Sequence, residues 1–187
     1  DGTAARLRPA DGRRVVLYAA TFTETLSSAR ALLGEISMQV ARGDRYWLLT
    51  LHPKTDPVLV QAYRQLAGPN AGFVEPEGLV PALRAADVLV CDTSSVVSEF
   101  VVQRKPVVTF RNRAPKAHMI DVADPAELET ALHRAFAPSE TLRHELAAYA
   151  DLIHPWRDGH SSERVLAAAR DFVAGQFLWT GIDYLGE

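Results

Sequence analysis

Short apolar runs alternate with helix-spaced segments along the first two thirds of the chain. The apolar runs predict strands at residues 15–19, 45–51, 72–74, 88–91, 107–110 and 119–122. Between them, apolar residues recur at helical spacing, which predicts helices at residues 25–42, 57–66, 79–85 and 94–102. Because the strands are apolar on both faces, the pattern predicts a doubly wound, Rossmann-like α/β fold. Its parallel sheet of about six strands is expected to carry helices on both faces.

The chain beyond Asp124 predicts helices only, at residues 125–136, 139–152 and 161–177. We therefore expect a polar lead-in at residues 1–13, an α/β domain of the nucleotide-binding type at 14–175 and an apolar tail at 176–187. The apolar side chains of the tail are Phe177, Leu178, Trp179, Ile182, Tyr184 and Leu185. A soluble protein seldom leaves such a group exposed. The tail is thus expected to contact an N-terminal domain outside this chain, or a second copy of this chain.

Length and charge narrow the class of protein. The 187 residues suit one such domain. The net charge of −3 provides no global basic field for nucleic acid, so we expect no nucleic-acid partner. Cys91 is the single cysteine, which excludes a disulfide within the chain and favours a reducing, cytoplasmic compartment. No apolar stretch is long enough to span a bilayer.

Polar residues follow several of the predicted strands. Ligands of open parallel sheets bind at the carboxyl ends of the strands, where the loops and helix starts meet. The candidates at those ends are Thr21, His52, Lys54, the run Asp92, Thr93, Ser94 and Ser95, and the pair Arg111 and Arg113.

The DTSS run is the most informative of these candidates. Its hydroxyls and backbone N–H groups stand at a predicted helix start, which is a favourable place for a phosphate. Glu99 lies four residues beyond Ser95 and shares its helix face, where it could accept from ribose hydroxyls. In the alternative interpretation, Thr93 or Ser94 is only a helix cap and Glu99 a solvated carboxylate.

His52 follows a buried strand and precedes Pro53, so it is expected to face the same crevice. It could donate to a phosphate or act as an acid or base, or it could be structural. Lys54 could bind phosphate or be a surface lysine.

Two weaker candidates remain. Ser161 and Ser162 of the DGHSSERV segment are either a second anion site or a helix cap. Arg111 and Arg113 either close over a diphosphate or belong to a solvated loop.

Two common nucleotide loops are absent from the sequence. The turn after the first strand reads AATFTETL, without the glycines of a P-loop or a GxGxxG turn. The six histidines show no metal-binding spacing. We therefore expect no metal and no cofactor, with the nucleotide-activated donor as a substrate.

The segments RRVVLYAATF, LLTLHPK, ADVLVCDTSSVVSEFVVQRKPVVTF and DGHSSERV together resemble the C-terminal half of the CDP-glycerol glycerophosphotransferases. This teichoic-acid polymerase family consists of two-domain GT-B transferases of cell-envelope synthesis. The resemblance implies a CDP-alcohol donor whose diphosphate lies near His52, Ser94 and Ser95, and an essential role for His52. Where this chain has Ala20 and Thr93, the family usually has Pro and Tyr, and the second change leaves fine specificity open.

The family's other essential histidine lies in the N-terminal half and has no counterpart here. The resemblance thus predicts that this chain contains half of an active site and is inactive alone. It also predicts a cytoplasmic location or, for a full-length protein, a peripheral location at the inner face of the membrane. The UDP-N-acetylglucosamine 2-epimerase and glycosyltransferase group also has a serine-rich helix start and a ribose glutamate. A UDP-sugar donor therefore stays open, as does a non-catalytic interaction module.

Overall fold

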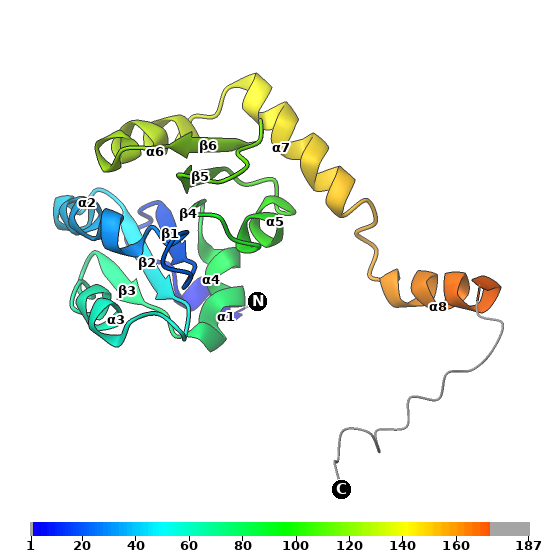
Figure 1. Cartoon of the computed structure of the whole chain (residues 1–187), viewed down its shortest axis with the longest axis horizontal. Helices are drawn as coiled ribbons and strands as arrows, with labels where there is room; N and C mark the ends of the chain where they lie inside the picture. The colour runs from blue at the N-terminus through cyan, green and yellow to red at the C-terminus, as the bar shows by residue number, and fades with distance from the viewer. Residues whose placement is uncertain (1, 173–187) are drawn as a thin grey trace, which may run out of the picture. The chain divides into compact units, whose positions relative to one another are not determined.

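The computed structural model describes residues 2–172, of which residues 2–153 form one compact unit and the remainder a second. The strands of the first unit are β1 (Val15–Ala20), β2 (Tyr46–Leu51), β3 (Ala71–Phe73), β4 (Val88–Cys91), β5 (Val107–Phe110) and β6 (Met119–Val122). They form one sheet in the order β3-β2-β1-β4-β5-β6, and all pairs are parallel (Figure 1). The predicted doubly wound sheet of six strands is confirmed.

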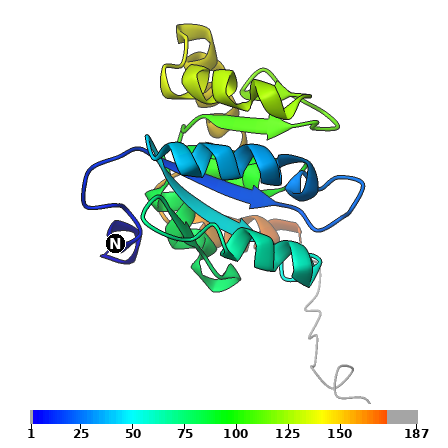
Figure 2. The ribbon, with the colours of Figure 1, turned by 90° about the vertical axis from the view of Figure 1, so that its left-hand side faces the viewer.

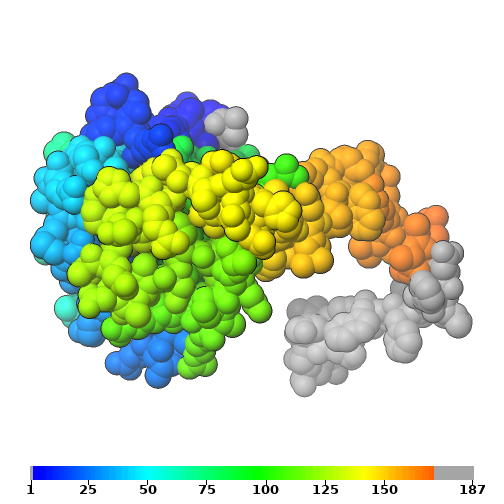
Figure 3. Space-filling view, turned by 90° about the horizontal axis from the view of Figure 1, so that it is seen from above, coloured from blue at the N-terminus to red at the C-terminus, as the bar shows by residue number. Residues whose placement is uncertain are grey.

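Helices cover both faces of this sheet. One face carries α2 (Ala29–Arg42), α3 (Pro57–Arg64) and α6 (Leu128–Phe136). Figure 2 views this face, with α2 lying in front of the sheet and running along the strands. The other face carries α1 (Gly2–Arg6), α4 (Leu79–Ala85), α5 (Val96–Val101) and α7 (Glu140–Ile153). Figure 3 looks onto the β6 edge, where residues of α6 and α7 form much of the surface.

The inner strands β1, β2, β4 and β5 are buried on both faces because their side chains alternate between two cores. Val16 and Tyr18 of β1 pack with α2, whereas Val15 and Leu17 pack with helices of the opposite face. All four side chains are fully buried. This explains why the strands appear in the sequence as continuous apolar runs rather than as an alternating pattern.

Several helix ends have a local cause. The side chain of Asp56 caps α3 by accepting from the backbone N–H of Val58 at 2.9 Å. Gly43 ends α2 in a left-handed conformation, with φ of 72°. The helix predicted to begin at residue 125 starts as a 3-10 turn, η2 (Pro125–Glu127), before α6.

One predicted boundary was wrong for a tertiary reason. The helix expected at residues 25–42 begins only at Ala29. The backbone N–H groups of Thr21 and Ser28, at the two ends of the preceding loop, donate to the carboxylate of Asp92. This carboxylate comes from more than sixty residues further along the chain, so the tether holds the loop out of the helix.

The second unit contains α8 (Ser161–Phe172). Near its start, the guanidinium of Arg164 pairs with Asp158 and lies 4.8 Å from the centre of the Trp156 ring. The predicted apolar tail at 176–187 lies outside the described residues, so the predicted domain bounds stay a prediction. Within residues 2–172, no helix combines the length and apolar character that a bilayer crossing requires.

Candidate functional site

A cavity of about 360 Å³ opens at the carboxyl ends of β1, β2 and β4. The chain runs outward from β1 to β3 and then returns to β4, so β1 and β4 flank the point where the strand order reverses. Open α/β sheets bind ligands at this point. We call this space the β1–β4 cavity; its polar lining is Thr21, Thr50, His52, Thr93, Ser94, Ser95 and Glu99.

Six of the predicted site residues therefore meet in one cavity. They come from three segments that lie far apart in the sequence and are joined by the parallel pairing of β1 with β2 and β4. Phe22, Pro76 and Leu79 also line the cavity, although no motif pointed to them. Phe22 follows β1 by two residues, so its place at a strand end was the available signal.

His52 is held by two neighbours. Its Nδ1 accepts a hydrogen bond from the backbone N–H of Lys54 at 3.1 Å, and its ring centre lies 4.3 Å from that of Phe22. A ring nitrogen that accepts carries no proton, so the proton of the neutral imidazole is assigned to Nε2. His52 can thus offer an Nε2–H donor to a ligand.

Asp92 lies beneath the cavity and not in its lining. It is fully buried, and its carboxylate accepts from the backbone N–H of Ser28 at 2.9 Å, from Ser28 Oγ at 3.0 Å and from the backbone N–H of Thr21 at 3.1 and 3.2 Å. Burial raises the pKa of Asp92, and these donors oppose that rise. Asp92 therefore holds the loop that carries Thr21 and Phe22.

The network continues from Ser28 into the core. Since the Ser28 hydroxyl donates to Asp92, the Tyr18 hydroxyl, 2.8 Å away, is the donor to Ser28 Oγ. Tyr18 stacks on Tyr63, whose hydroxyl donates to the carbonyl of Ala29 at 2.8 Å. Burial raises the pKa of both phenols, which keeps them protonated as donors. The wall of the cavity is thus anchored by a buried polar chain.

The hydroxyls after β4 have different partners. Thr93 Oγ1 accepts from the backbone N–H of Arg113 at 3.0 Å, which joins the loops after β4 and β5. Ser94 Oγ makes only a long contact of 3.4 Å with the N–H of Val96, and the Ser95 side chain makes no capping hydrogen bond. The serine pair is therefore not committed to capping α5. Both hydroxyls are accessible at the cavity, together with Glu99 on the exposed face of the helix.

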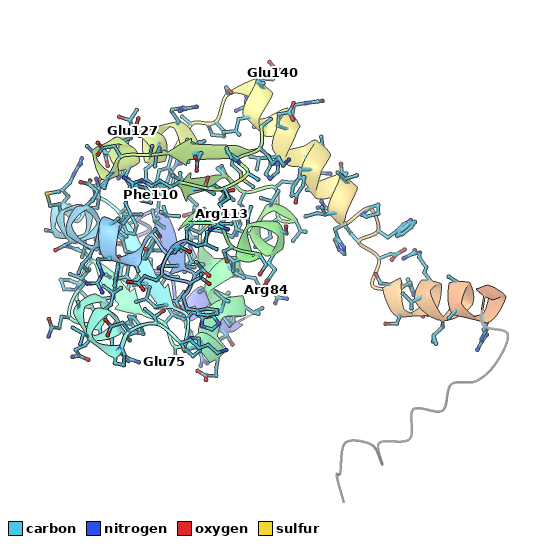
Figure 4. The ribbon with its side chains drawn as sticks, in the orientation of Figure 1. Glu75, Arg84, Phe110, Arg113, Glu127 and Glu140 are labelled. Atoms are coloured by element: carbon cyan, nitrogen blue, oxygen red, sulfur yellow. The ribbon has the colours of Figure 1, made fainter. Side chains whose placement is uncertain are left out.

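The remaining predicted residues lie elsewhere. Arg111, at a φ of 50°, donates through Nε to the carbonyl of Ala123 at 2.8 Å. Arg113 is exposed on the loop after β5 (Figure 4). Lys54 lines a neighbouring cavity, and its Nζ lies 5.3 Å from the centre of the Phe22 ring. None of the three lines the β1–β4 cavity.

Ser161 and Ser162 belong to the second unit, where they begin α8. Just before that helix, the carboxylate of Asp158 accepts from the backbone N–H of His160 at 3.1 Å. Over the described part of the chain, no three His, Cys, Asp or Glu side chains are grouped so as to hold a metal ion.

The family model for CDP-Glycerol:Poly(glycerophosphate) glycerophosphotransferase matches residues 3–116. These residues contain β1 to β5 and the whole lining of the β1–β4 cavity. The chain belongs to this glycerophosphotransferase family. The predicted resemblance is thereby confirmed.

Solved structures agree with the family in fold. The wall teichoic acid polymerase TagF, in a structure soaked with CDPG, is 17% identical with a TM-score of 0.65, over 91% of this chain and 44% of that chain. The glycosyltransferase SnogD from Streptomyces nogalater is 20% identical with a TM-score of 0.61, over 87% of this chain and 45% of that chain.

The structure named as a putative UDP-N-acetylglucosamine 2-epimerase from Listeria monocytogenes is 16% identical. Its TM-score is 0.60, over 86% of this chain and 45% of that chain. These TM-scores show a GT-B-like α/β fold. The glycerophosphotransferase-family chain spans less than half the length of each of these proteins.

A short stretch of 41 residues is 39% identical to the beta-galactosidase BoGH2A of Bacteroides ovatus. It covers 22% of this chain and 5% of that protein, and it carries no argument about function.

Proposed function

We propose that this chain is the donor-binding domain of a transferase that uses a CDP-linked alcohol in the synthesis of a cell-envelope polymer. One observation carries the proposal. The β1–β4 cavity gathers His52, Ser94, Ser95 and Glu99 at the strand ends of a glycerophosphotransferase-family domain. Hydroxyl and imidazole donors suit a diphosphate, and a carboxylate suits ribose hydroxyls.

The side chains would act mainly by binding and by electrostatic stabilisation. When the bond between the transferred phosphate and the nucleotide breaks, negative charge develops on the leaving nucleotide. His52 Nε2–H and the Ser94 and Ser95 hydroxyls would stabilise that charge, because preorganised donors gain most where charge develops. Glu99 would hold the ribose and so fix the position of the diphosphate. No metal or cofactor is part of the proposal.

The acceptor-activating group is proposed to belong to another domain, since the chain spans under half the length of its structural relatives. The apolar tail at 176–187 would meet that domain or, in its absence, a second copy of the chain. The proposal also includes peripheral attachment of a full-length protein to the membrane.

A panel of CDP, UDP and ADP, read by thermal shift, tests the proposal and identifies the base. CDP should raise the melting temperature most. The Ser94→Ala and Ser95→Ala double variant should lose the shift, whereas Ser37→Ala, on α2 and outside the cavity lining, should keep it. Failure of every nucleotide at millimolar concentration would instead favour a non-catalytic interaction module.

A UDP-sugar donor is the second candidate. A UDP co-structure of MnaA from S. aureus has a TM-score of 0.62 with this chain at 13% identity. The polar lining of the cavity suits phosphates and ribose and so leaves the base undecided. A larger thermal shift with UDP than with CDP would select this candidate.

A further inference from the structure

The serine pair of the β1–β4 cavity lies in a turn that α5 itself holds only weakly. The Ser95 side chain makes no capping hydrogen bond, and Ser94 Oγ has only its 3.4 Å contact with the N–H of Val96. The backbone N–H of Val97 donates to the carbonyl of Ser94 at 3.4 Å, which is long for such a bond. The contacts that fix the two hydroxyls in place must therefore come from outside the helix.

The loop after β5 makes two hydrogen bonds to this turn. It lies beside the turn because β4 and β5 are parallel neighbours. The side-chain amide of Asn112 donates to the backbone carbonyl of Asp92 at 3.3 Å, and the backbone N–H of Arg113 (Figure 4) donates to Thr93 Oγ1 at 3.0 Å. We call residues 111–114 the β5 corner. None of them lines the β1–β4 cavity, so the corner acts on the cavity only through the turn.

The side chain of Asn112 is itself fixed in orientation. Its Oδ1 accepts from the backbone N–H of Ala114 at 2.9 Å, which leaves Nδ2 to face the carbonyl of Asp92. The backbone N–H of Asn112 donates to Asp121 Oδ1 at 3.0 Å, and the same oxygen accepts from Thr109 Oγ1 at 2.7 Å. An amide side chain supplies both the acceptor and the donor that this position needs, whereas a carboxylate cannot donate.

Arg111 forms the corner in an unfavourable backbone conformation. Its φ of 50° lies in the left-handed region, which residues other than glycine adopt rarely and at a cost. Two hydrogen bonds hold it there: its backbone N–H donates to the carbonyl of Val122 at 2.9 Å, and its Nε–H donates to the carbonyl of Ala123 at 2.8 Å. Such strain persists only where the surrounding structure enforces it, and it is concentrated at functional sites. The next two residues are Asn112 and Arg113, which make the contacts to the turn.

We propose that Asn112 is a positioning residue for the donor diphosphate, and that the left-handed Arg111 is the residue that places it. The role at a diphosphate rests on the proposed function. Asn112 holds the carbonyl of Asp92 and the neighbouring N–H of Arg113 holds the hydroxyl of Thr93, and the serine pair follows directly in the chain. Preorganised donors bind a phosphate more tightly than mobile donors, because less freedom is lost on binding.

Isothermal titration of CDP into the full chain tests the positioning role. Asn112→Ala should weaken CDP binding about threefold to tenfold, the range for one lost hydrogen bond. Asn112→Asp keeps the acceptor for Ala114 but turns a second acceptor towards the carbonyl of Asp92, so it should weaken binding at least as much. Ser139→Ala, which removes the side-chain bond to the N–H of Leu142 at the start of α7, is the control for lost stability. It should lower the melting temperature and leave the CDP affinity unchanged.

A double-mutant cycle separates positioning from an independent effect. If Asn112 acts through Ser94 and Ser95, its substitution should matter little once both hydroxyls are gone. In the Ser94→Ala and Ser95→Ala background, Asn112→Ala should weaken CDP binding by about twofold or less, as measured by NMR titration at millimolar CDP. A residue with a purely structural role would lower the melting temperature without this coupling. Fully additive losses of affinity would overturn the positioning role.

Glycine at position 111 distinguishes a strained corner from a phosphate ligand. Arg111→Ala and Arg111→Gly both remove the guanidinium, but only glycine takes a φ of 50° without strain. Arg111→Gly should therefore have the higher melting temperature of the two and keep more of the CDP affinity. Equal losses of affinity in the two variants would assign the guanidinium to the phosphate and overturn the role of Arg111 as the corner.

Hydrogen exchange in the nucleotide-free protein distinguishes failure of this inference from failure of the donor-binding proposal. The backbone N–H groups of Val97 and Ser98 donate to the carbonyls of Ser94 and Ser95. Both should exchange at least about threefold faster in Asn112→Ala than in the wild type. Faster exchange there, with no nucleotide binding by the wild type, would refute the donor-binding proposal alone. Wild-type CDP affinity in Asn112→Ala would refute the positioning role alone.

Discussion

Removing the Asp92 carboxylate should destabilise the protein and loosen one wall of the β1–β4 cavity. The carboxylate is the acceptor for three donors: the backbone N–H groups of Thr21 and Ser28, and the Ser28 hydroxyl. An unpaired buried donor costs about 1–3 kcal/mol. Ser28 is buried and Thr21 is half-buried, so water can reach part of the gap. Asp92→Ala should therefore lower the free energy of unfolding by about 3–5 kcal/mol.

Asp92→Asn isolates the role of the second oxygen. The amide keeps one acceptor but turns an NH2 group towards the donors, and we expect a loss of about 1–3 kcal/mol. The assay is urea unfolding, with Glu77→Gln on the exposed surface as the control, which should change stability by less than about 0.5 kcal/mol. A loss below about 1 kcal/mol in Asp92→Ala would refute the tether.

The same residue predicts a pH dependence. Burial raises the pKa of Asp92 above its ordinary value of 3.8, so the folded state binds this proton more tightly than the unfolded state. Its contribution to the free energy of unfolding should therefore fall as the pH rises from about 3.8 through the raised pKa. Asp92→Asn should lack this component. An identical pH profile in the wild type and Asp92→Asn would contradict the inference.

Three other substitutions test separate parts of the structure. His52→Ala removes a donor from the β1–β4 cavity and should weaken CDP binding about fivefold to tenfold in calorimetry; unchanged affinity would contradict its role. Tyr18→Phe removes the donor to Ser28 and should cost about 1 kcal/mol in urea unfolding, and no loss would contradict that bond. Hydrogen bonds from Arg45 lower the pKa of Glu129 from 4.5 to about 2, so its stabilising contribution is lost as the pH falls through this range. Glu129→Gln should reduce the loss of stability over this pH range. An unchanged dependence of the free energy of unfolding on pH would contradict a stabilising pair between Arg45 and Glu129.

The sequence predicted the strands well because their signal is local. The apolar runs at 88–91 and 107–110 coincide with β4 and β5, since strands buried on both faces need a continuous apolar sequence. The run at 119–122 coincides with the edge strand β6, although its Asp121 is exposed. The start of α2 was missed because Asp92, distant in sequence, binds the amides of the preceding loop. Helix propensity, which depends on neighbouring residues in the sequence, cannot predict such a long-range contact.

The grouping of the cavity residues could be predicted in part for similar reasons. The rule for strand ends predicted that His52, Ser94 and Ser95 lie together, and they line one cavity because parallel strands end at one edge. The rule could not separate Asp92, which turns into the core, from its neighbours that turn to the cavity. Nor could it separate Lys54 from His52: the tight turn in which the N–H of Thr55 donates to the carbonyl of His52 sends them to different cavities.

The central claim is that the β1–β4 cavity binds a nucleotide diphosphate through its serine pair. Isothermal titration of CDP into the wild type, the Ser94→Ala and Ser95→Ala double variant and Ser37→Ala tests it most directly. We predict binding by the wild type and by Ser37→Ala, and a loss of at least about tenfold in the double variant, which removes two hydrogen bonds to a charged ligand. Equal CDP affinity in all three proteins, or heat of binding in none, would contradict the claim.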